Sequence, residues 1–142
     1  MGTQTILRTV TINAPADKVW SFIGSEDGIN RWFGSTVTMQ AEVDGDYKEI
    51  HEVNGTAYHL HGRILAYVVN QALTVAVRIV APDSAKWDNY TVFTIRLTEQ
   101  DNQTDVTLEH SGFEYVPDGF YTGFQAGWEE TIKRLEALFV IA

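Results

Sequence analysis

Histidine and tyrosine are the residue types of this chain best suited to chemistry at a site shielded from water. The sequence has four histidines, six tyrosines and no cysteine, so thiolate nucleophiles, disulfides and cysteine metal sites are excluded. Apolar and polar residues alternate around His110, as they do in a strand with one buried face. His110 lies two and four residues after Leu108 and Val106, so it should point to the same side as they do and face the core. A buried imidazole can orient a ligand, shuttle a proton, or be satisfied by neighbours such as Tyr58. We expect a structural or ligand-orienting role for His110, and the identity of any catalytic residue stays unknown.

Two further histidines, His59 and His61, lie two residues apart on one face of an expected strand, together with Arg63. A catalytic zinc usually has three protein ligands, and His51 or Glu49 would complete such a set only in a favourable strand register. A solvated strand face is the plainer interpretation. No metal is therefore expected.

The other face of that strand carries Tyr58, Leu60 and Gly62, which are then the residues expected to face the interior. Gly62 is interpreted as a bulge or as a point of close backbone packing. Glu49, Glu109 and Glu114 are candidate general bases, but Glu109 has the opposite parity to His110 and should point to solvent.

Aromatic residues make up 12% of the chain, more than are needed to seal a core of this size. Aromatic walls with a few polar tips are typical of small-molecule sites, and plain packing is the alternative. Packing is the preferred interpretation for Trp20, Phe22 and Trp128, although Trp128 also belongs to the expected site. Trp87, in a loop after Pro82, is interpreted as a lid or a loop anchor. The residues expected at a ligand site are His110, Tyr58, Trp32, Phe33, Tyr47, Trp87, Tyr121, Phe124 and Trp128.

A long amphipathic helix and a set of short strands must position these residues. From Asp118 to Ile141 the apolar residues follow a 3.6-residue period, with aromatic residues in the first half and aliphatic residues in the second. Short helices are expected after Pro15 and Ser25, and Asn54-Gly55 and Asp44-Gly45 signal hairpins. Alternating segments predict strands at residues 5–13, 36–43, 47–53, 56–69, 73–79, 90–98 and 106–115.

These elements predict an α+β fold in which a curved antiparallel sheet wraps around the long C-terminal helix. The two short N-terminal helices should close one end of the sheet. A cavity and its mouth are expected at the aromatic half of the long helix, near His110 and Trp32.

Composition limits the classes of function. The 142 residues, 44% of them hydrophobic, are enough for one domain, expected to span residues 1–142. The net charge of −9 would repel phosphate-rich partners, so nucleic acids and anionic membrane surfaces are not expected partners. No apolar segment approaches the roughly 20 residues of a membrane-spanning helix. The absence of a secretory signal and of cysteine predicts a cytoplasmic protein.

Several segments together resemble a known family. Residues 12–20, Ile-Asn-Ala-Pro-Ala-Asp-Lys-Val-Trp, and the spaced Trp32 resemble the opening strand and helix of the START-like, helix-grip (SRPBCC) superfamily. Residues 62–65 with Leu73, residues 108–113, and Gly127-Trp128 with the leucines that follow resemble one bacterial branch of it. That branch is named after the activator of the heat-shock-ninety chaperone's ATPase.

The resemblance implies an elongated cavity between sheet and helix, which the superfamily uses for lipids, polyketides, plant hormones and other apolar molecules. It implies binding of a small hydrophobic or amphipathic ligand, with no cofactor. Two alternatives stay open. One is an acid–base enzyme of the cyclase type, with His110 and a tyrosine as its agents.

The other alternative is an interaction module, associated with a chaperone, whose cavity is filled by its own side chains. In the co-chaperone, the corresponding module follows another domain that contacts the chaperone. A chain of 142 residues has no room for that domain, so a chaperone partner is the lesser expectation.

Overall fold

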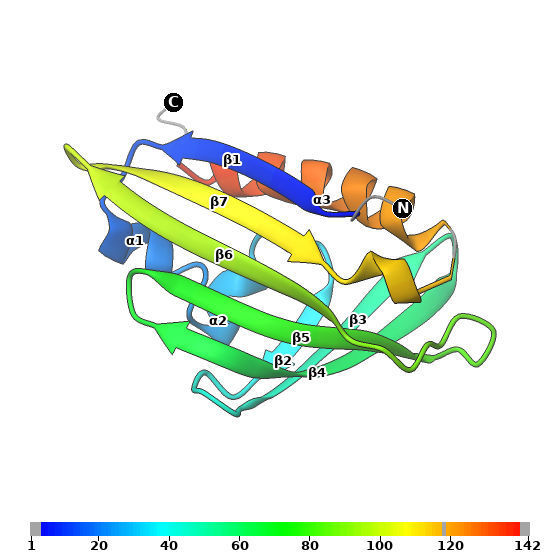
Figure 1. Cartoon of the computed structure of the whole chain (residues 1–142). Helices are drawn as coiled ribbons and strands as arrows, with labels where there is room; N and C mark the ends of the chain where they lie inside the picture. The colour runs from blue at the N-terminus through cyan, green and yellow to red at the C-terminus, as the bar shows by residue number, and fades with distance from the viewer. Residues whose placement is uncertain (1–3, 118, 140–142) are drawn as a thin grey trace.

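The computed structural model describes residues 4–117 and 119–139. In these residues a seven-stranded antiparallel sheet, in the order β1-β7-β6-β5-β4-β3-β2, curves around one long helix (Figure 1). This arrangement confirms the α+β helix-grip class. The strands are β1 (Ile6–Ile12), β2 (Thr36–Met39), β3 (Asp46–Val53), β4 (Thr56–Val68), β5 (Ala72–Ala81), β6 (Thr91–Gln100) and β7 (Gln103–Ser111). The helices are α1 (Ala16–Trp20), α2 (Glu26–Ile29), the short 3-10 helix η1 (Phe113–Tyr115) and α3 (Phe120–Ala137).

Turn chemistry sets the hairpins. Asn54 and Gly55 both have positive φ, at 51° and 83°, and form the two-residue turn between β3 and β4 that their types predict. The Asp44-Gly45 pair behaves differently, because it closes a longer connection over residues 40–45. The predicted strand 36–43 therefore ends at Met39, where the chain leaves the sheet and doubles back through hydrogen bonds among Gln40, Glu42 and Gly45.

Alternate residues of each strand face α3 and build the core. Phe93 of β6 pairs with His110 of β7, and both side chains are buried, whereas Glu109 is exposed, as its parity predicts. Gly62 is a point of close packing: a Cβ there would overlap the backbone carbonyl of Ala76 on β5. The bulges of β4 lie elsewhere, between residues 59 and 60 and between 64 and 66.

Strand β7 ends at Ser111, earlier than the predicted residue 115. Gly112 has φ +97°, a left-handed conformation that turns the chain into η1. Helix α3 then begins after Gly119, and Asp118 and Ile141, the predicted cap and end of the helix, lie outside the described residues. None of the described helices combines the length and the apolarity that crossing a membrane requires.

Arg134 fixes the C-terminal half of α3 to the chain between α2 and β2. Its Nε donates to the carbonyl of Trp32 at 2.9 Å, and its Nη2 donates to the carbonyl of Phe33 at 3.1 Å. A side chain at Gly34, whose φ is +74°, would collide with the guanidinium. Beside this contact, Leu135 is fully buried, so this end of α3 is held by both packing and directed hydrogen bonds.

Replacing Arg134 by Met should lower the free energy of unfolding by about 1–3 kcal/mol, because two backbone carbonyls lose their donor. Arg134→Lys should recover only part of the loss, since an ammonium cannot reproduce the guanidinium fork. Lys133→Met, which removes only a surface ion pair with Glu130, is the control and should cost less than about 0.5 kcal/mol. Urea unfolding measures all three variants, and equal losses in the two Met variants would contradict this role for Arg134.

Candidate functional site

A cavity of about 380 Å³ lies between the concave face of the sheet and the N-terminal half of α3. The tip of the β3–β4 hairpin, the β5–β6 loop and the start of α3 gather at one end of the molecule, on the right of Figure 1, whereas α1 and α2 lie toward the other end. The residues that line the cavity are Phe33, Glu49, His51, Val53, Tyr58, Leu60, Val77, Ile79, Phe93, His110, Gly119, Phe120, Gly123, Phe124, Gly127, Trp128 and Thr131.

Glycines leave the space open on the helix side. Gly119, Gly123 and Gly127 recur every fourth residue and line the cavity, and a Cβ built on any of them would meet no atom within 4 Å. Residues at this spacing share one face of a helix. Each interior glycine costs a helix about 1 kcal/mol relative to alanine. The volume of the cavity is therefore maintained at the expense of helix stability.

His110 lies in the cavity wall with both ring nitrogens already bonded. The indole Nε1 of Trp128 donates to its Nδ1 at 2.9 Å, and its Nε2 lies 2.8 Å from Oγ1 of Thr91. An indole N–H can only donate, so Nδ1 carries no proton and Nε2–H donates to Thr91. The Thr91 hydroxyl donates in turn to the carbonyl of Val77 at 3.3 Å. A directed chain of hydrogen bonds thus runs from α3 through β7 and β6 to β5.

This environment keeps the imidazole neutral. Burial lowers the pKa of His110 from its ordinary value of 6.5 to about 3. The rings of Phe93, Phe113 and Phe124 pack around it, with centroids 4.6–5.8 Å away. A proton added at Nδ1 would also face the N–H of Trp128. The geometry favours a structural role for His110 over a proton shuttle.

Glu49 brings a carboxylate to the opposite wall. The hydroxyl of Tyr47 donates to its Oε1 at 2.7 Å, and the hydroxyl of Ser35 donates to its Oε2 at 2.8 Å. Burial, and then the charge and hydrogen bond of Glu49, raise the pKa of Tyr47 well above its ordinary value, so the phenol remains a donor. His51 and Tyr58 face each other across β3 and β4 and also line the cavity. The polar groups of this wall therefore gather on two adjacent strands.

Five of the nine residues predicted at a ligand site line the cavity, namely Phe33, Tyr58, His110, Phe124 and Trp128. Trp32 does not, because it is fully buried and its indole donates to the carbonyl of Phe22 at 2.6 Å. Tyr47 is also fully buried and is related to the cavity only through its bond to Glu49.

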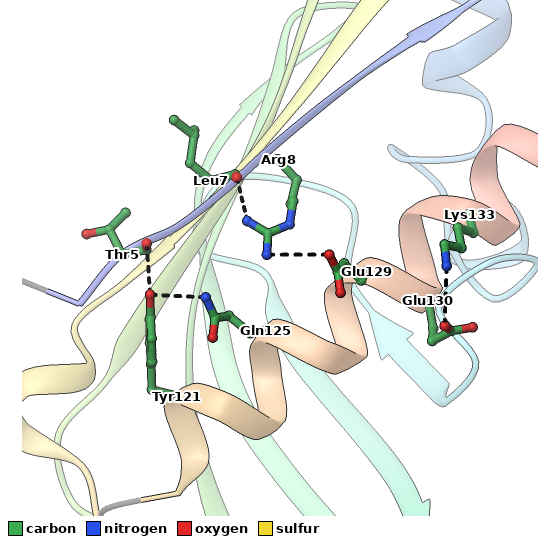
Figure 2. Close-up of polar contacts among 8 residues, drawn as sticks. All are labelled: Thr5, Leu7, Arg8, Tyr121, Gln125, Glu129, Glu130 and Lys133. Carbon is green, nitrogen blue, oxygen red and sulfur yellow. Dashed lines mark hydrogen bonds and ion pairs between the residues drawn. The ribbon is translucent and has the colours of Figure 1, made fainter.

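Trp87 and Tyr121 are the other two predicted residues outside the lining. Trp87 packs edge-on against Phe120, with ring centroids 4.6 Å apart, and so anchors the β5–β6 loop on the cavity wall. Tyr121 lies on a different face of α3, where its hydroxyl donates to the carbonyl of Thr5 at 3.4 Å (Figure 2). In an α-helix adjacent residues point about 100° apart, so Phe120 lines the cavity while Tyr121 contacts Thr5, the residue before β1.

Glu49 and His51 were expected only as a base or as metal ligands, and the glycines of α3 were not predicted to line a site. Glycine carries no hydrophobic signal, but three glycines at four-residue spacing within an amphipathic helix were a detectable sign of an open face. His59 is half-buried and His61 is exposed, and neither lines the cavity. In the described part of the chain no three His, Cys, Asp or Glu side chains are grouped to hold a metal ion.

Comparison with known proteins places this architecture among proteins of similar size. Residues 13–140 match the family described as Activator of Hsp90 ATPase homolog 1-like protein. The crystal structure of MLL2253 from Mesorhizobium loti is similar with a TM-score of 0.80 and 24% identity, over 94% of this chain and 95% of that one. CV1439 from Chromobacterium violaceum is similar with a TM-score of 0.79 and 22% identity, over 98% and 99% of the two chains.

A third similar structure is DynU16, a putative protein in the dynemicin biosynthetic locus. Its TM-score is 0.76 at 16% identity, and the match covers 96% of this chain and 47% of that one. No curated protein sequence matches this chain significantly. At these identities the structural matches show a shared fold.

Acid should destabilise the protein partly through His110. The unfolded chain takes up this proton near pH 6.5 and the folded chain only near pH 3, so stability is lost as the pH falls between these values. From pH 7 to 4.5 this one group should lower the free energy of unfolding by about 2–3 kcal/mol. Urea unfolding at both pH values measures the loss.

His110→Gln should lack this part of the acid loss, since its amide can accept from Trp128 and donate to Thr91 but does not titrate. His61→Gln, at an exposed position, is the control and should keep the full loss. If His110→Gln lost as much stability in acid as the unmodified protein, the lowered pKa assigned to the buried His110 would be wrong.

Proposed function

The chain belongs to the Activator of Hsp90 ATPase homolog 1-like family, and we propose that it binds a small amphipathic molecule in the cavity between its sheet and α3. The observation that carries this proposal is the cavity itself, at about 380 Å³. Small-molecule sites in proteins commonly measure about 300–1,000 Å³ and combine apolar walls with a few placed polar groups. The fold is compatible with ligand binding.

The distribution of polar atoms supports an amphipathic ligand. The helix side of the cavity presents Phe120, Phe124 and Trp128 together with bare glycine backbone. The β3–β4 side presents Glu49, His51 and Tyr58, and the side chains of the last two make no hydrogen bond to another described residue. A ligand with an apolar body and one polar end matches this division, because its polar end can bond the β3–β4 side while its body packs against the rings.

The two alternatives have less support. An acid–base enzyme using His110 would need a free ring nitrogen, and both nitrogens are bonded to Trp128 and Thr91. An interaction module needs no cavity, and large side chains at the glycine positions of α3 would give a more stable domain. The family name is compatible with a chaperone partner, and DynU16 is associated with a biosynthetic locus.

Filling the cavity from the helix should separate ligand binding from stability. We expect Gly123→Leu and Gly127→Leu to abolish binding of the neutral fluorescent probe N-phenyl-1-naphthylamine. Both variants should keep the stability of the unmodified protein or gain up to about 1 kcal/mol, because leucine is the better helix former. Fluorescence titration and urea unfolding measure the two effects.

Ala126→Leu is the matched control, because it adds the same side chain to an exposed position of the same helix outside the lining. This variant should bind the probe as the unmodified protein does. Failure of the unmodified protein to bind the probe, or equal binding by the filled variants, would contradict the proposal. Native mass spectrometry of the purified protein would show any small molecule that it retains.

A further inference from the structure

We propose that the cavity selects organic cations, and that the polar end of its ligand is a protonated amine paired with Glu49. This inference rests on the proposed function and specifies the charge of the ligand. Its three supports are the incomplete pairing of Glu49, the aromatic rings that line the same cavity, and the absence of lysine and arginine from the described lining.

Glu49 is a half-buried carboxylate that is oriented but not neutralised. Its two oxygens each accept one hydrogen bond, from the neutral hydroxyls of Tyr47 and Ser35. A carboxylate oxygen can accept two, so one position on each oxygen remains open. Within the described chain Glu49 has no lysine or arginine partner at ion-pair distance. A partly buried charge without a countercharge is costly, and a cationic ligand would supply the missing partner.

Aromatic rings continue from this carboxylate around the cavity. Tyr47 contacts Phe93 at a centroid distance of 5.9 Å, and Phe93 contacts Phe33 and Trp128 at 6.1 and 5.3 Å. Phe33, Phe93 and Trp128 all line the cavity. Aromatic faces attract ammonium groups and their alkyl substituents, and several rings lining the same cavity as one carboxylate are suited to an organic cation.

The same walls disfavour an anion. Among the described residues no lysine or arginine lines the cavity. The N–H groups of Trp128 and His110 are committed to the hydrogen-bond chain that ends at Val77, so they cannot donate to a carboxylate or phosphate. The net charge of −9 adds a long-range field that attracts cations. A fatty-acid carboxylate would meet Glu49 with no lysine or arginine in the described lining to compensate its charge.

Three probes with the same apolar chain test the charge preference: n-octylammonium, n-octanol and n-octanoate, measured at pH 8 by displacement of N-phenyl-1-naphthylamine. Charge-assisted hydrogen bonds are about twice as strong as neutral ones. Octylammonium should therefore bind roughly tenfold more tightly than octanol, a difference of about 1.4 kcal/mol. Octanoate should bind most weakly. This comparison uses the unmodified protein and does not depend on any variant folding.

Glu49→Gln should remove the advantage of octylammonium and leave the affinity for octanol within about twofold. The amide keeps the neighbouring bonds, since it can accept from Tyr47 and donate to Ser35. Glu52→Gln removes the same charge from an exposed position of β3 outside the cavity lining. This control should keep the tenfold preference, because the cavity carboxylate is unchanged.

Equal binding of octylammonium and octanol, a preference for octanoate, or an unchanged preference in Glu49→Gln would each overturn the cation assignment. Ligand binding in the cavity would stand in all three cases, because the probes would still displace the dye. If neither the dye nor any octyl probe bound the unmodified protein, the proposed function would fail together with this inference.

Discussion

The hydrogen bond from the Trp128 indole to His110 is the interaction on which the cavity depends. It joins α3 to β7. Two further hydrogen bonds continue from His110 through Thr91 to the carbonyl of Val77 on β5. At this level of the helix Gly123 and Gly127 offer no side chains, whereas Trp128 packs against Phe93 and Phe124 packs against His110. The directed hydrogen bonds act together with this packing to fix the helix over the sheet. The bond also requires a neutral imidazole, so the depressed pKa of His110 is a condition of the architecture.

Stability and an open cavity place opposite demands on α3. At the C-terminal end the helix is fixed conventionally, with Leu135 fully buried and Arg134 bonded to the carbonyls of Trp32 and Phe33. At the N-terminal end Gly123 and Gly127 leave space that a larger side chain would fill. A core selected for stability alone would close such a void, because empty volume forfeits dispersion contacts. The C-terminal half of α3 therefore anchors the helix, whereas the N-terminal half leaves the cavity open next to the polar side chains of β3 and β4.

Parity and turn chemistry made much of the fold and part of the site predictable. The alternation around His110 and Tyr58 correctly indicated which side of each strand faces inward, and Asn54-Gly55 formed the hairpin that its types require. A side chain that faces the interior of the protein does not necessarily line the cavity. Tyr47 and Glu49 share a face of β3, yet Tyr47 is fully buried and Glu49 borders the cavity. Whether an inward side chain packs or borders a void depends on how far away the facing layer lies.

By itself, the sequence determined the order of strands and helices, the amphipathic character of α3 and the absence of cysteine chemistry. These properties depend on residue type and on spacing over a few residues. Only the tertiary structure decided that both nitrogens of His110 are occupied, that Glu49 is held by Tyr47 and Ser35, and that glycines form the helix side of the cavity. Apart from the local bond between Tyr47 and Glu49, these features depend on the separation of segments that are not adjacent in the chain. That separation is set by the curvature of the whole sheet and by the fixed ends of α3.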